Sequence, residues 1–468
     1  MSVVGVIPPV KKHLKGLNEI HSRRNLCYNF TRLLLIPLLF FFMSLAFLSV
    51  ASASDDQEQP YISDPNLEVE QVFRGLHLPT TMAFIGPDDI LVLEKNSGTV
   101  ERIINGHKLN QPLLDVDVSY SDERGMLGIA IAQNETNNTN PYVFLYYTKS
   151  KTNGDEKISS STYTVSNRLY RYELVNDSKL QNPKLLLSTP STGRSFHVGG
   201  KLLIGPDHNL YVTIGDQTKF KATQAQNIKN GRFPDRTSGI LRITPDGQAP
   251  PDNILGKTYP LNLYYAYGIR NSFGIDFDPV TGKLWDTELG PSYGDEINLV
   301  EPGFNSGWSR VQGIWSPSDT SGSSYDLTIR NEQLNPHNLV DFDGKGKYST
   351  PEFIWKTPAC VTAIKFLNSD KYGAEYKDDV FVGTVTGHLY HFDMNKNRTG
   401  FILQNNLVDK IADTPSRSEL DQIQFGDNFG GITDIQVGPN DGLLYILSTN
   451  GAIYKIIPKE NKLTGQNN

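Results

Sequence analysis

Three observations on the 468-residue sequence predict an all-β fold, a six-bladed β-propeller with inserted loops over one face. Short β-branched and aromatic runs alternate with turns of Gly, Pro, Asp and Asn. Long helical periodicity is nearly absent. One pattern of an apolar strand, a turn near Gly-Pro-Asp and a strand like Leu-Tyr-Val recurs, each unit comprising about four strands. The repeats fall at residues 81–103, 125–172, 196–243, 274–300, 362–392 and 431–456.

The N-terminal segment predicts export. Basic residues precede an uncharged apolar run, Leu33–Val50, which is followed by Ala51-Ser-Ala53 and an acidic stretch. This order of charge, apolar core and small residues is typical of a secretory signal peptide. Because the apolar run just reaches the length of a membrane span, an uncleaved N-terminal anchor is the alternative. We therefore expect a secreted or extracytoplasmic protein, tethered to the membrane if the segment is retained.

Composition sets the remaining boundaries. We assign residues 1–53 to the signal peptide or anchor, 54–65 to a short linker, 66–458 to the propeller and 459–468 to a polar tail. Leu67–Phe73 is expected to supply an outer strand to the last blade and so to close the ring. The inserted loops lie at residues 134–165, 216–237 and 307–350, and loops of this kind commonly carry function.

The charge of the chain argues against nucleic acid as a partner. Residues 1–53 hold 6 of the 44 Lys/Arg and 1 of the 51 Asp/Glu, so the remainder has 38 basic and 50 acidic residues and a net charge of −12. A nucleic-acid-binding domain carries a basic surface, and the sequence contains no basic cluster outside the N-terminal segment.

The third unit contains a candidate general base. His197 stands before a Gly-Gly pair and an apolar strand, and the next strand ends in Gly215-Asp216. Neighbouring strands of this length bring their ends to one rim of a sheet. An imidazole oriented by a carboxylate is suited to general base catalysis. The alternative is that the two side chains only cap turns.

The fourth unit contains a second group of candidate residues. Arg270 and Asn271 precede a strand and would offer hydrogen-bond donors from its starting rim. Gly290-Pro291 interrupts regular sheet because Pro has no N–H, and the free carbonyls of such a turn suit a hard cation such as calcium. Asp295-Glu296 could add negative charge to that site, or could be an ordinary solvated turn.

These motifs together resemble those of the soluble glucose/sorbosone dehydrogenase family. The resemblance covers nearly all of residues 66–458, with the motifs in order. It is carried by Glu-Arg-Gly-Met-Leu-Gly, His-x-Gly-Gly-Lys-Leu, Tyr-Val-Thr-Ile-Gly-Asp-Gln, Tyr-Gly-Ile-Arg-Asn and Gly-Pro…Asp-Glu-Ile-Asn. Members are six-bladed propellers that oxidise aldose sugars with pyrroloquinoline quinone (PQQ) and calcium.

The resemblance implies a catalytic role for three residues. His197 corresponds to the base that takes the sugar hydroxyl proton while hydride passes to the quinone. Asp216 corresponds to the carboxylate that orients it. Arg270 corresponds to a donor over the developing charge, and with Asn271 it also corresponds to a cofactor-binding residue.

The same resemblance implies metal, cofactor and substrate contacts. The carbonyls of Gly290 and Pro291 correspond to ligands of the cofactor calcium, and Glu296 to a ligand of a second, structural calcium. The remaining matches are Trp355 and Thr357 beside the cofactor and Glu123 on the substrate side, where other members have Gln.

Three departures weaken the match. Thr386 stands where glucose-oxidising members have Lys, and Gly431 and Thr433 stand where they have Arg. PQQ is a tricarboxylate, so the loss of three cations removes much of the charge that would hold it. The sequence therefore favours an exported dehydrogenase acting on a sugar or polyol, with an unidentified electron acceptor. A non-catalytic propeller that binds a carbohydrate or a protein is the alternative.

Overall fold

The computed structural model describes residues 59–134, 140–158, 165–191, 195–217, 227, 234–315, 339–414 and 416–459. These residues belong to one compact unit, Asp56–Asn468. The expected signal peptide or anchor, residues 54–58 of the expected linker and most of the C-terminal tail lie outside the described residues, as do large parts of the three inserted loops. Within the described part, no helix is long and apolar enough to cross a membrane.

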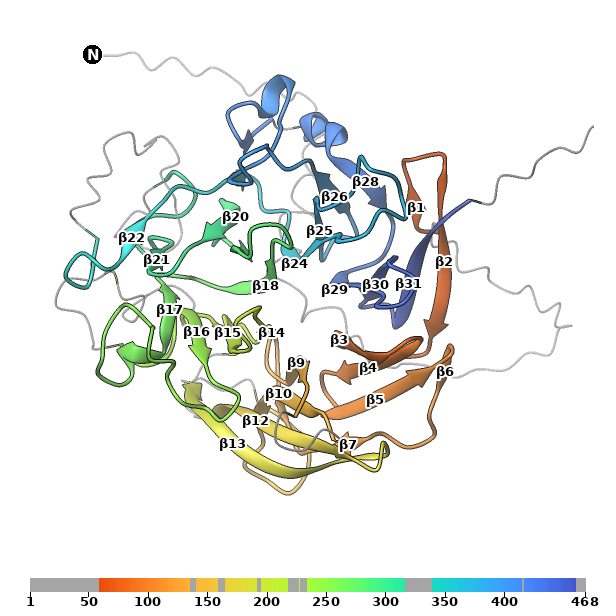
Figure 1. Cartoon of the computed structure of the whole chain (residues 1–468), viewed down its shortest axis with the longest axis vertical. Helices are drawn as coiled ribbons and strands as arrows, with labels where there is room; N and C mark the ends of the chain where they lie inside the picture. Colours follow the sequence, from red (N-terminus) through yellow and green to blue (C-terminus); the bar gives the residue numbers. More distant parts are fainter. Residues whose placement is uncertain are drawn as a thin grey trace, which may run out of the picture. The chain divides into compact units, whose positions relative to one another are not determined.

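The described residues form a ring of mainly antiparallel sheets, with parallel pairs only at the outer edges of the third and fourth sheets (Figure 1). The first sheet contains β3 (Pro79–Gly86), β4 (Asp89–Glu94), β5 (Thr99–Ile104), β6 (His107–Lys108) and β7 (Leu114–Asp115). The second contains β9 (Met126–Ala132), β10 (Tyr142–Lys149), β12 (Val165–Val175) and β13 (Lys179–Ser191). The third contains β14 (Leu202–Ile204), β15 (Leu210–Ile214), β16 (Gly239–Ile243), β17 (Tyr264–Tyr267), β21 (Phe304–Asn305) and β22 (Lys347–Tyr348).

The C-terminal half continues the ring. The fourth sheet contains β18 (Ser272–Phe277), β19 (Leu284–Glu288), β20 (Asp295–Val300), β23 (Phe353–Trp355) and β27 (Ile411–Ala412). The fifth contains β24 (Val361–Phe366), β25 (Val380–Thr384), β26 (Leu389–Phe392), β28 (Gln424–Asp427) and β1 (Tyr61–Ile62). The sixth contains β29 (Ile432–Val437), β30 (Leu444–Ser448), β31 (Ala452–Pro458) and β2 (Leu67–Arg74).

A few short elements lie outside these sheets. Two-residue strands β8 (Ser119–Tyr120) and β11 (Glu156–Lys157) pair with each other. The short 3₁₀ helices are η1 (Leu261–Leu263), η3 (Asn405–Leu407) and η4 (Ser418–Gln422).

The all-β propeller prediction is confirmed, but the prediction of six blades is wrong, because the described residues form five complete blades. Each blade keeps the number of its sheet. In the described residues, five sheets have four consecutive antiparallel strands and form complete blades, whereas the first sheet has only three long strands. Its outer edge is split into β6 and β7, both paired with β5. Pro112 lies between these two pieces, and because Pro has no N–H to donate it interrupts a regular fourth strand.

The N-terminal strand closes the ring, as the sequence predicts. β2 pairs antiparallel with β31, from Leu67 opposite Pro458 to Arg74 opposite Ala452. β1, which falls in the expected linker, also pairs with the propeller, at β28. The two ends of the ring are therefore joined by main-chain hydrogen bonds rather than by side chains alone.

The core lies between adjacent sheets. Apolar side chains from the fourth and fifth sheets, for example Trp285, Phe353 and Val382, form one buried cluster, and comparable clusters lie between other neighbouring sheets. The first strand of each sheet lies nearest the centre in Figure 1, and neighbouring first strands are in contact. Residues at the two ends of these strands consequently lie near the centre of the two faces of the ring.

Candidate functional site

His197 and Asp216 meet at the start of the third blade. β14 and β15 form a hairpin, with Leu202 opposite Val212. The segment before β14, which carries His197, therefore lies beside the segment after β15, which carries Asp216. His197 Nδ1 lies 2.6 Å from Asp216 Oδ1, and the residues are only 4% and 0% exposed. A carboxylate at this distance accepts the proton when Nδ1 carries it, and Nε2 of such an imidazole can then accept another.

The Gly-Gly pair after His197 is required by close packing. Gly199 has φ +65°, and a Cβ placed there would lie 2.6 Å from the carbonyl oxygen of Thr213. At Gly200, with φ +114°, a Cβ would lie 2.9 Å from Leu127 Cβ. Both positions therefore exclude larger residues. The pair lets the segment that carries His197 lie directly against the hairpin.

Trp308 completes the environment of Asp216 and was missed by the sequence reasoning. Its indole Nε1 donates to Asp216 Oδ2 at 2.7 Å, and its backbone N–H donates to the carbonyl of Gly268. Both oxygens of the Asp216 carboxylate are thus engaged, which fixes its orientation toward the imidazole. The only feature of the sequence that points to this residue is a Trp in the loop after the fourth unit, within Asn-Ser-Gly-Trp.

Asn271 joins the second, third and fourth blades. Its Oδ1 accepts a hydrogen bond from Gly199 N–H at 3.1 Å, and its Nδ2 donates to Glu123 Oε2 at 3.1 Å. The same Glu123 oxygen accepts from the backbone N–H of Val198. The structure therefore brings Glu123, the His197 segment and Asn271 together. The buried Asn271 amide thus holds the His197 segment in position.

Arg270 directly precedes Asn271. Its backbone N–H donates to Glu288 Oε1 at 2.7 Å, and its guanidinium donates to the carbonyl of Leu289 and lies 5.5 Å from the Trp308 ring centroid. Its buried Nε has no hydrogen-bond partner among the described residues. A buried N–H of a cation without a partner favours an acceptor supplied by a ligand.

The Gly290-Pro291 turn is held in place by a buried carboxylate. Asp295 Oδ1 accepts from Gly290 N–H at 2.9 Å, and Asp295 Oδ2 accepts from Cys360 N–H at 2.7 Å. A Cβ at Gly290 would lie 1.9 Å from the carbonyl oxygen of Tyr293, so the turn is tight and needs glycine. Burial raises the pKa of Asp295 to about 6. Asp295 is thus a structural support of the turn, not a solvated residue.

Glu296 belongs to a second buried acidic group, defined by Asp286, Glu288 and Glu296. Glu288 pairs with Glu296 and Asp286 with Asn298 across β19 and β20, so the four side chains share one face. Burial, reinforced by the neighbouring carboxylates, raises the pKa of Asp286 and of Glu288 to about 8 and that of Glu296 well above its usual value.

Three buried oxygens around this acidic group have no hydrogen-bond partner in the described residues. They are Asp286 Oδ2, Asn298 Oδ1 and Gln312 Oε1. Glu296 itself accepts hydrogen bonds from Gln312 Nε2, Asn298 Nδ2 and the backbone N–H of Gly313. A set of carboxylate and amide oxygens without enough donors is suited to a hard cation such as calcium.

The two residues expected beside the cofactor have different surroundings. The Trp355 ring is buried in the core, 4.6 Å from the Phe353 ring centroid and 5.8 Å from that of Tyr390. The Trp355 backbone carbonyl accepts a hydrogen bond from Gly294 N–H, and this contact helps to hold the loop that contains the Gly290-Pro291 turn. Thr357 is exposed, and its carbonyl accepts from Arg417.

At the three positions that lack the expected cations, the neighbouring groups are also uncharged. Thr386 Oγ1 lies 2.9 Å from Thr384 Oγ1, and Thr433 Oγ1 donates to the carbonyl of Leu447. A Cβ at Gly431 would lie 2.7 Å from Thr449 Oγ1 and 2.9 Å from the carbonyl of Val385. Position 431 therefore leaves no room for a side chain without local movement.

Lys95 is a further cation that the sequence reasoning missed. It follows β4, and its Nζ donates to Asn96 Oδ1 and to the carbonyl of Arg124. Burial lowers the pKa of Lys95 to about 8, although the charges of Asp122 and Glu123 oppose the shift. Lys95 falls in the first repeat at the end of the second strand, close to where Asp216 falls in the third, and comparing repeats would have identified it.

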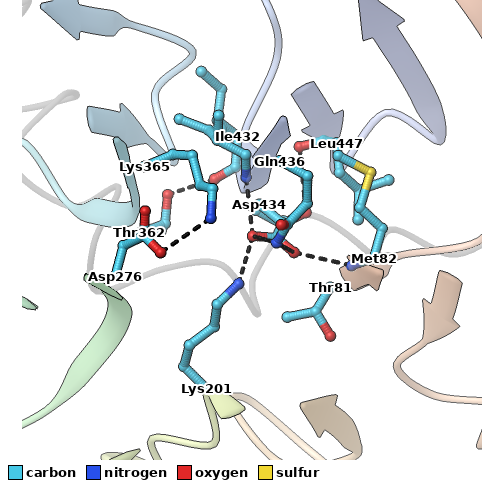
Figure 2. Close-up of polar contacts among 12 residues, drawn as sticks. Thr81, Met82, Lys201, Asp276, Thr362, Lys365, Ile432, Asp434, Gln436 and Leu447 are labelled. Atoms are coloured by element: carbon cyan, nitrogen blue, oxygen red, sulfur yellow. Dashed lines mark hydrogen bonds and ion pairs between the residues drawn. The ribbon is translucent and has the colours of Figure 1, made fainter. Parts of the chain in front are cut away.

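Two ion pairs join inner strands, or residues next to them, from different blades, as Figure 2 shows. Lys201 Nζ lies 2.5 Å from Asp434 Oδ1, joining the third and sixth blades, and Met82 N–H donates to Asp434 Oδ2. Lys365 Nζ donates to Asp276 Oδ1 at 3.0 Å, joining the fifth and fourth blades. Lys365 and Asp276 line a cavity of about 840 Å³ at the ends of the inner strands.

Comparison with known proteins identifies the family of the chain. The family model described as glucose/sorbosone dehydrogenase matches residues 76–455, which is most of the chain. The chain belongs to the glucose/sorbosone dehydrogenase family.

Two curated relatives and one solved structure illustrate the similarity. The quinoprotein glucose dehydrogenase B of Acinetobacter calcoaceticus is 31% identical over 277 residues, which is 56% of this chain and only 55% of that protein. The aldose sugar dehydrogenase YliI of Escherichia coli is 26% identical over 399 residues, covering 84% of this chain and 93% of the relative. The PQQ-bound aldose sugar dehydrogenase of Streptomyces coelicolor has a similar fold, with TM-score 0.58 and 22% identity over 84% of this chain and 98% of the other.

Proposed function

We propose that this member of the family oxidises a hydroxyl group of a sugar or polyol with PQQ and calcium. The observation that carries the proposal is the His197–Asp216–Trp308 arrangement, in which a buried imidazole is oriented through Nδ1 and keeps Nε2 for a substrate proton. A domain that only binds a partner has no need for such an orientation.

The chemistry divides between the protein and the cofactor. PQQ, when bound, supplies the two-electron acceptor for the hydride that leaves the hydroxyl-bearing carbon. His197 Nε2 takes the hydroxyl proton, so the substrate loses one hydride and one proton and becomes a carbonyl compound. Asp216 holds the imidazole in the accepting tautomer and stabilises the imidazolium that forms. The acceptor that later reoxidises the cofactor is not identified by the chain.

The other site residues hold ligands in this proposal. Arg270, with its unpartnered Nε, would donate to a cofactor carboxylate or to the developing negative charge. Asn271 would contact the cofactor and would be held in place by its hydrogen bond to Glu123. Glu123 would accept a hydrogen bond from a substrate hydroxyl. Thr357 would contribute at the rim, and Trp355 would support the calcium turn.

The described residues also fit two calcium sites. The carbonyls of Gly290 and Pro291 belong to a tight turn fixed by Asp295, and Glu296 lies among unpartnered oxygens of Asp286 and Gln312. The donors are all oxygens, as calcium prefers. Calcium at the first turn would also offset the missing positive charge around a tricarboxylate.

A reconstitution assay tests the proposal. Purified protein is mixed with PQQ and calcium, and reduction of an artificial dye is followed with a panel of aldoses and polyols. We expect a cofactor absorbance band and dye reduction that requires both additions. His197→Ala, with the band retained, should lose dye reduction. No reduction by wild-type protein with any substrate, despite a bound-cofactor band, would contradict the proposal.

The second candidate is a non-catalytic propeller that binds a carbohydrate or a protein. The neutral contacts of Thr386, Gly431 and Thr433 favour it, because they remove cations from the expected cofactor cradle. Absence of a cofactor band at millimolar calcium would favour this candidate. In either case we propose export through residues 1–53, which N-terminal sequencing of protein from its own host would test by a start near Ser54.

A further inference from the structure

The fifth blade carries a cluster of metal-ligating side chains far from the His197 site in the chain. Asp379 precedes β25, His391 lies on β26 and Asp393 follows β26. Their ligand atoms lie within 4.8 Å of one another, and no other group of three His, Cys, Asp or Glu in the described residues does so. We propose that Asp379, His391 and Asp393 bind a divalent transition metal ion such as Zn²⁺.

Strand register explains why the three side chains meet. β25 and β26 pair with Val380 opposite Phe392 and Phe381 opposite His391. Continuing this register by one residue sets Asp379 opposite Asp393, and His391 is two residues from Asp393, so all three share one face. Two carboxylates directly opposite each other destabilise a strand pair unless a cation lies between them.

The distances suit a metal of this size. His391 Nε2 lies 3.2 Å from Asp379 Oδ2 and 3.7 Å from Asp393 Oδ1. Two ligands each about 2.0–2.1 Å from a tetrahedral Zn²⁺ are about 3.3 Å apart, so small side-chain adjustments suffice. One imidazole and two carboxylates suit Zn²⁺ and related ions, whereas Ca²⁺ prefers oxygen ligands alone.

The surroundings orient the ligands and leave one side open. Asp379 Oδ1 accepts from the backbone N–H of Met394 at 2.8 Å, which directs Oδ2 toward His391. The imidazole is flanked by Phe381 and Tyr376, with ring centroids 4.9 and 5.1 Å away. The Asp379 and His391 side chains are only 12% and 15% exposed, whereas Asp393 is 54% exposed, so the metal can enter and retain water.

Metal titration of the untagged, chelator-treated protein tests the proposal. Zn²⁺ is added in buffer that already contains 1 mM Ca²⁺, so that the calcium sites of the proposed function are filled and the result does not depend on them. We expect about one equivalent of Zn²⁺ to bind and the melting temperature to rise. His391→Gln and Asp393→Asn should each weaken Zn²⁺ binding by at least about 10- to 100-fold, the loss seen when even a supporting residue of a metal site is removed.

Two comparisons separate a metal site from an ordinary ion pair. Without Zn²⁺, Asp393→Asn should raise the melting temperature slightly because it removes a like charge opposite Asp379, whereas a purely structural His391–Asp393 pair would make the variant less stable. Asp370→Asn, an exposed aspartate of the same blade, should bind Zn²⁺ as wild type does. The proposal is overturned if wild type binds no Zn²⁺ up to about 1 mM, or if His197→Ala abolishes binding while His391→Gln does not.

Discussion

Two sets of buried carboxylates in the described residues differ in how their charge is compensated. On or next to the inner strands, Asp434 has Lys201 and Asp276 has Lys365 (Figure 2), and Asp278 has Arg398 at 2.6 Å. On β19 and β20, Asp286, Glu288 and Glu296 are buried beside one another, and no ion pair of 4 Å or less is found for them in the described residues.

The pKa directions follow this difference. Burial alone would raise the pKa of Asp278, yet the hydrogen bonds and charge of Arg398 lower it overall. Burial raises the pKa of Asp286 to about 8, and the charge of Glu296 adds to the shift. The first set is compensated by cations of the protein itself, whereas the second lacks positive charge that a bound cation would supply. The following variants test this contrast.

The largest expected effect is the loss of the proposed base. His197→Ala should lower kcat by about 10²- to 10⁴-fold, the usual contribution of general base catalysis, while Asp216→Asn should cost less because the base remains. The measurement is dye reduction by the reconstituted protein, with circular dichroism to confirm folding. His107→Ala, an exposed histidine of β6, is the matched control. Undiminished turnover in His197→Ala would remove the residue from the mechanism.

Breaking an ion pair of the first set should cost stability. Lys201→Met leaves the buried Asp434 carboxylate without its cation, which typically destabilises a protein by about 3–5 kcal/mol. Urea unfolding measures the change, and Lys371→Met, at an exposed lysine, should leave stability nearly unchanged. Adding Asp434→Asn to Lys201→Met should recover part of the loss. Equal stability of Lys201→Met and wild type would show that the pair is dispensable.

Calcium should stabilise the protein by binding at the Gly290-Pro291 turn and at the buried acidic group that contains Glu296. Binding to the folded state alone contributes about 2.7 kcal/mol when free calcium is 100 times its Kd, so the melting temperature should rise from chelator to excess calcium. Glu296→Gln should reduce this rise, and Glu301→Gln, an exposed residue of the same blade, should not. Identical melting curves with chelator and with millimolar calcium would exclude both proposed calcium sites.

Strand repeats and local hairpins were predictable from the sequence, whereas distant contacts were not. The register of β14 and β15 brings His197 to Asp216 across only 19 residues, and the repeat pattern indicates the six sheets. Trp308 lies 92 residues from Asp216, and a contact of this range leaves no periodic signal. The broken edge of the first sheet depends on Pro112, whose missing N–H matters only once the pairing partner is known.

Lys95 gives a smaller, pH-dependent effect. Its folded pKa of about 8 lies below the ordinary value of 10.5, so between these pH values the unfolded chain binds more protons than the folded one. Stability should therefore rise with pH in this window, by no more than about 1.4 kcal/mol per pH unit for one proton. Lys95→Met should remove this slope relative to wild type in urea unfolding from pH 7 to 10. Exposed Lys396→Met should keep it, and an unchanged slope in Lys95→Met would assign the effect elsewhere.

The smallest effect concerns the missing cofactor cations. Thr433→Arg restores one cation on the half-buried inner strand β29, and we expect PQQ to bind roughly tenfold tighter, equivalent to about 1.4 kcal/mol. Gly431→Arg should instead destabilise the protein, because even its Cβ would approach Thr449 Oγ1 to 2.7 Å. Titration of apo-protein with PQQ at low and high salt gives the measurement, since a charge effect weakens with salt. Thr433→Gln, similar in reach but neutral, is the control. If it tightens binding as much as Thr433→Arg, or if neither responds to salt, then position 433 does not face a tricarboxylate and the electrostatic contrast between the two sets of carboxylates does not extend to the cofactor.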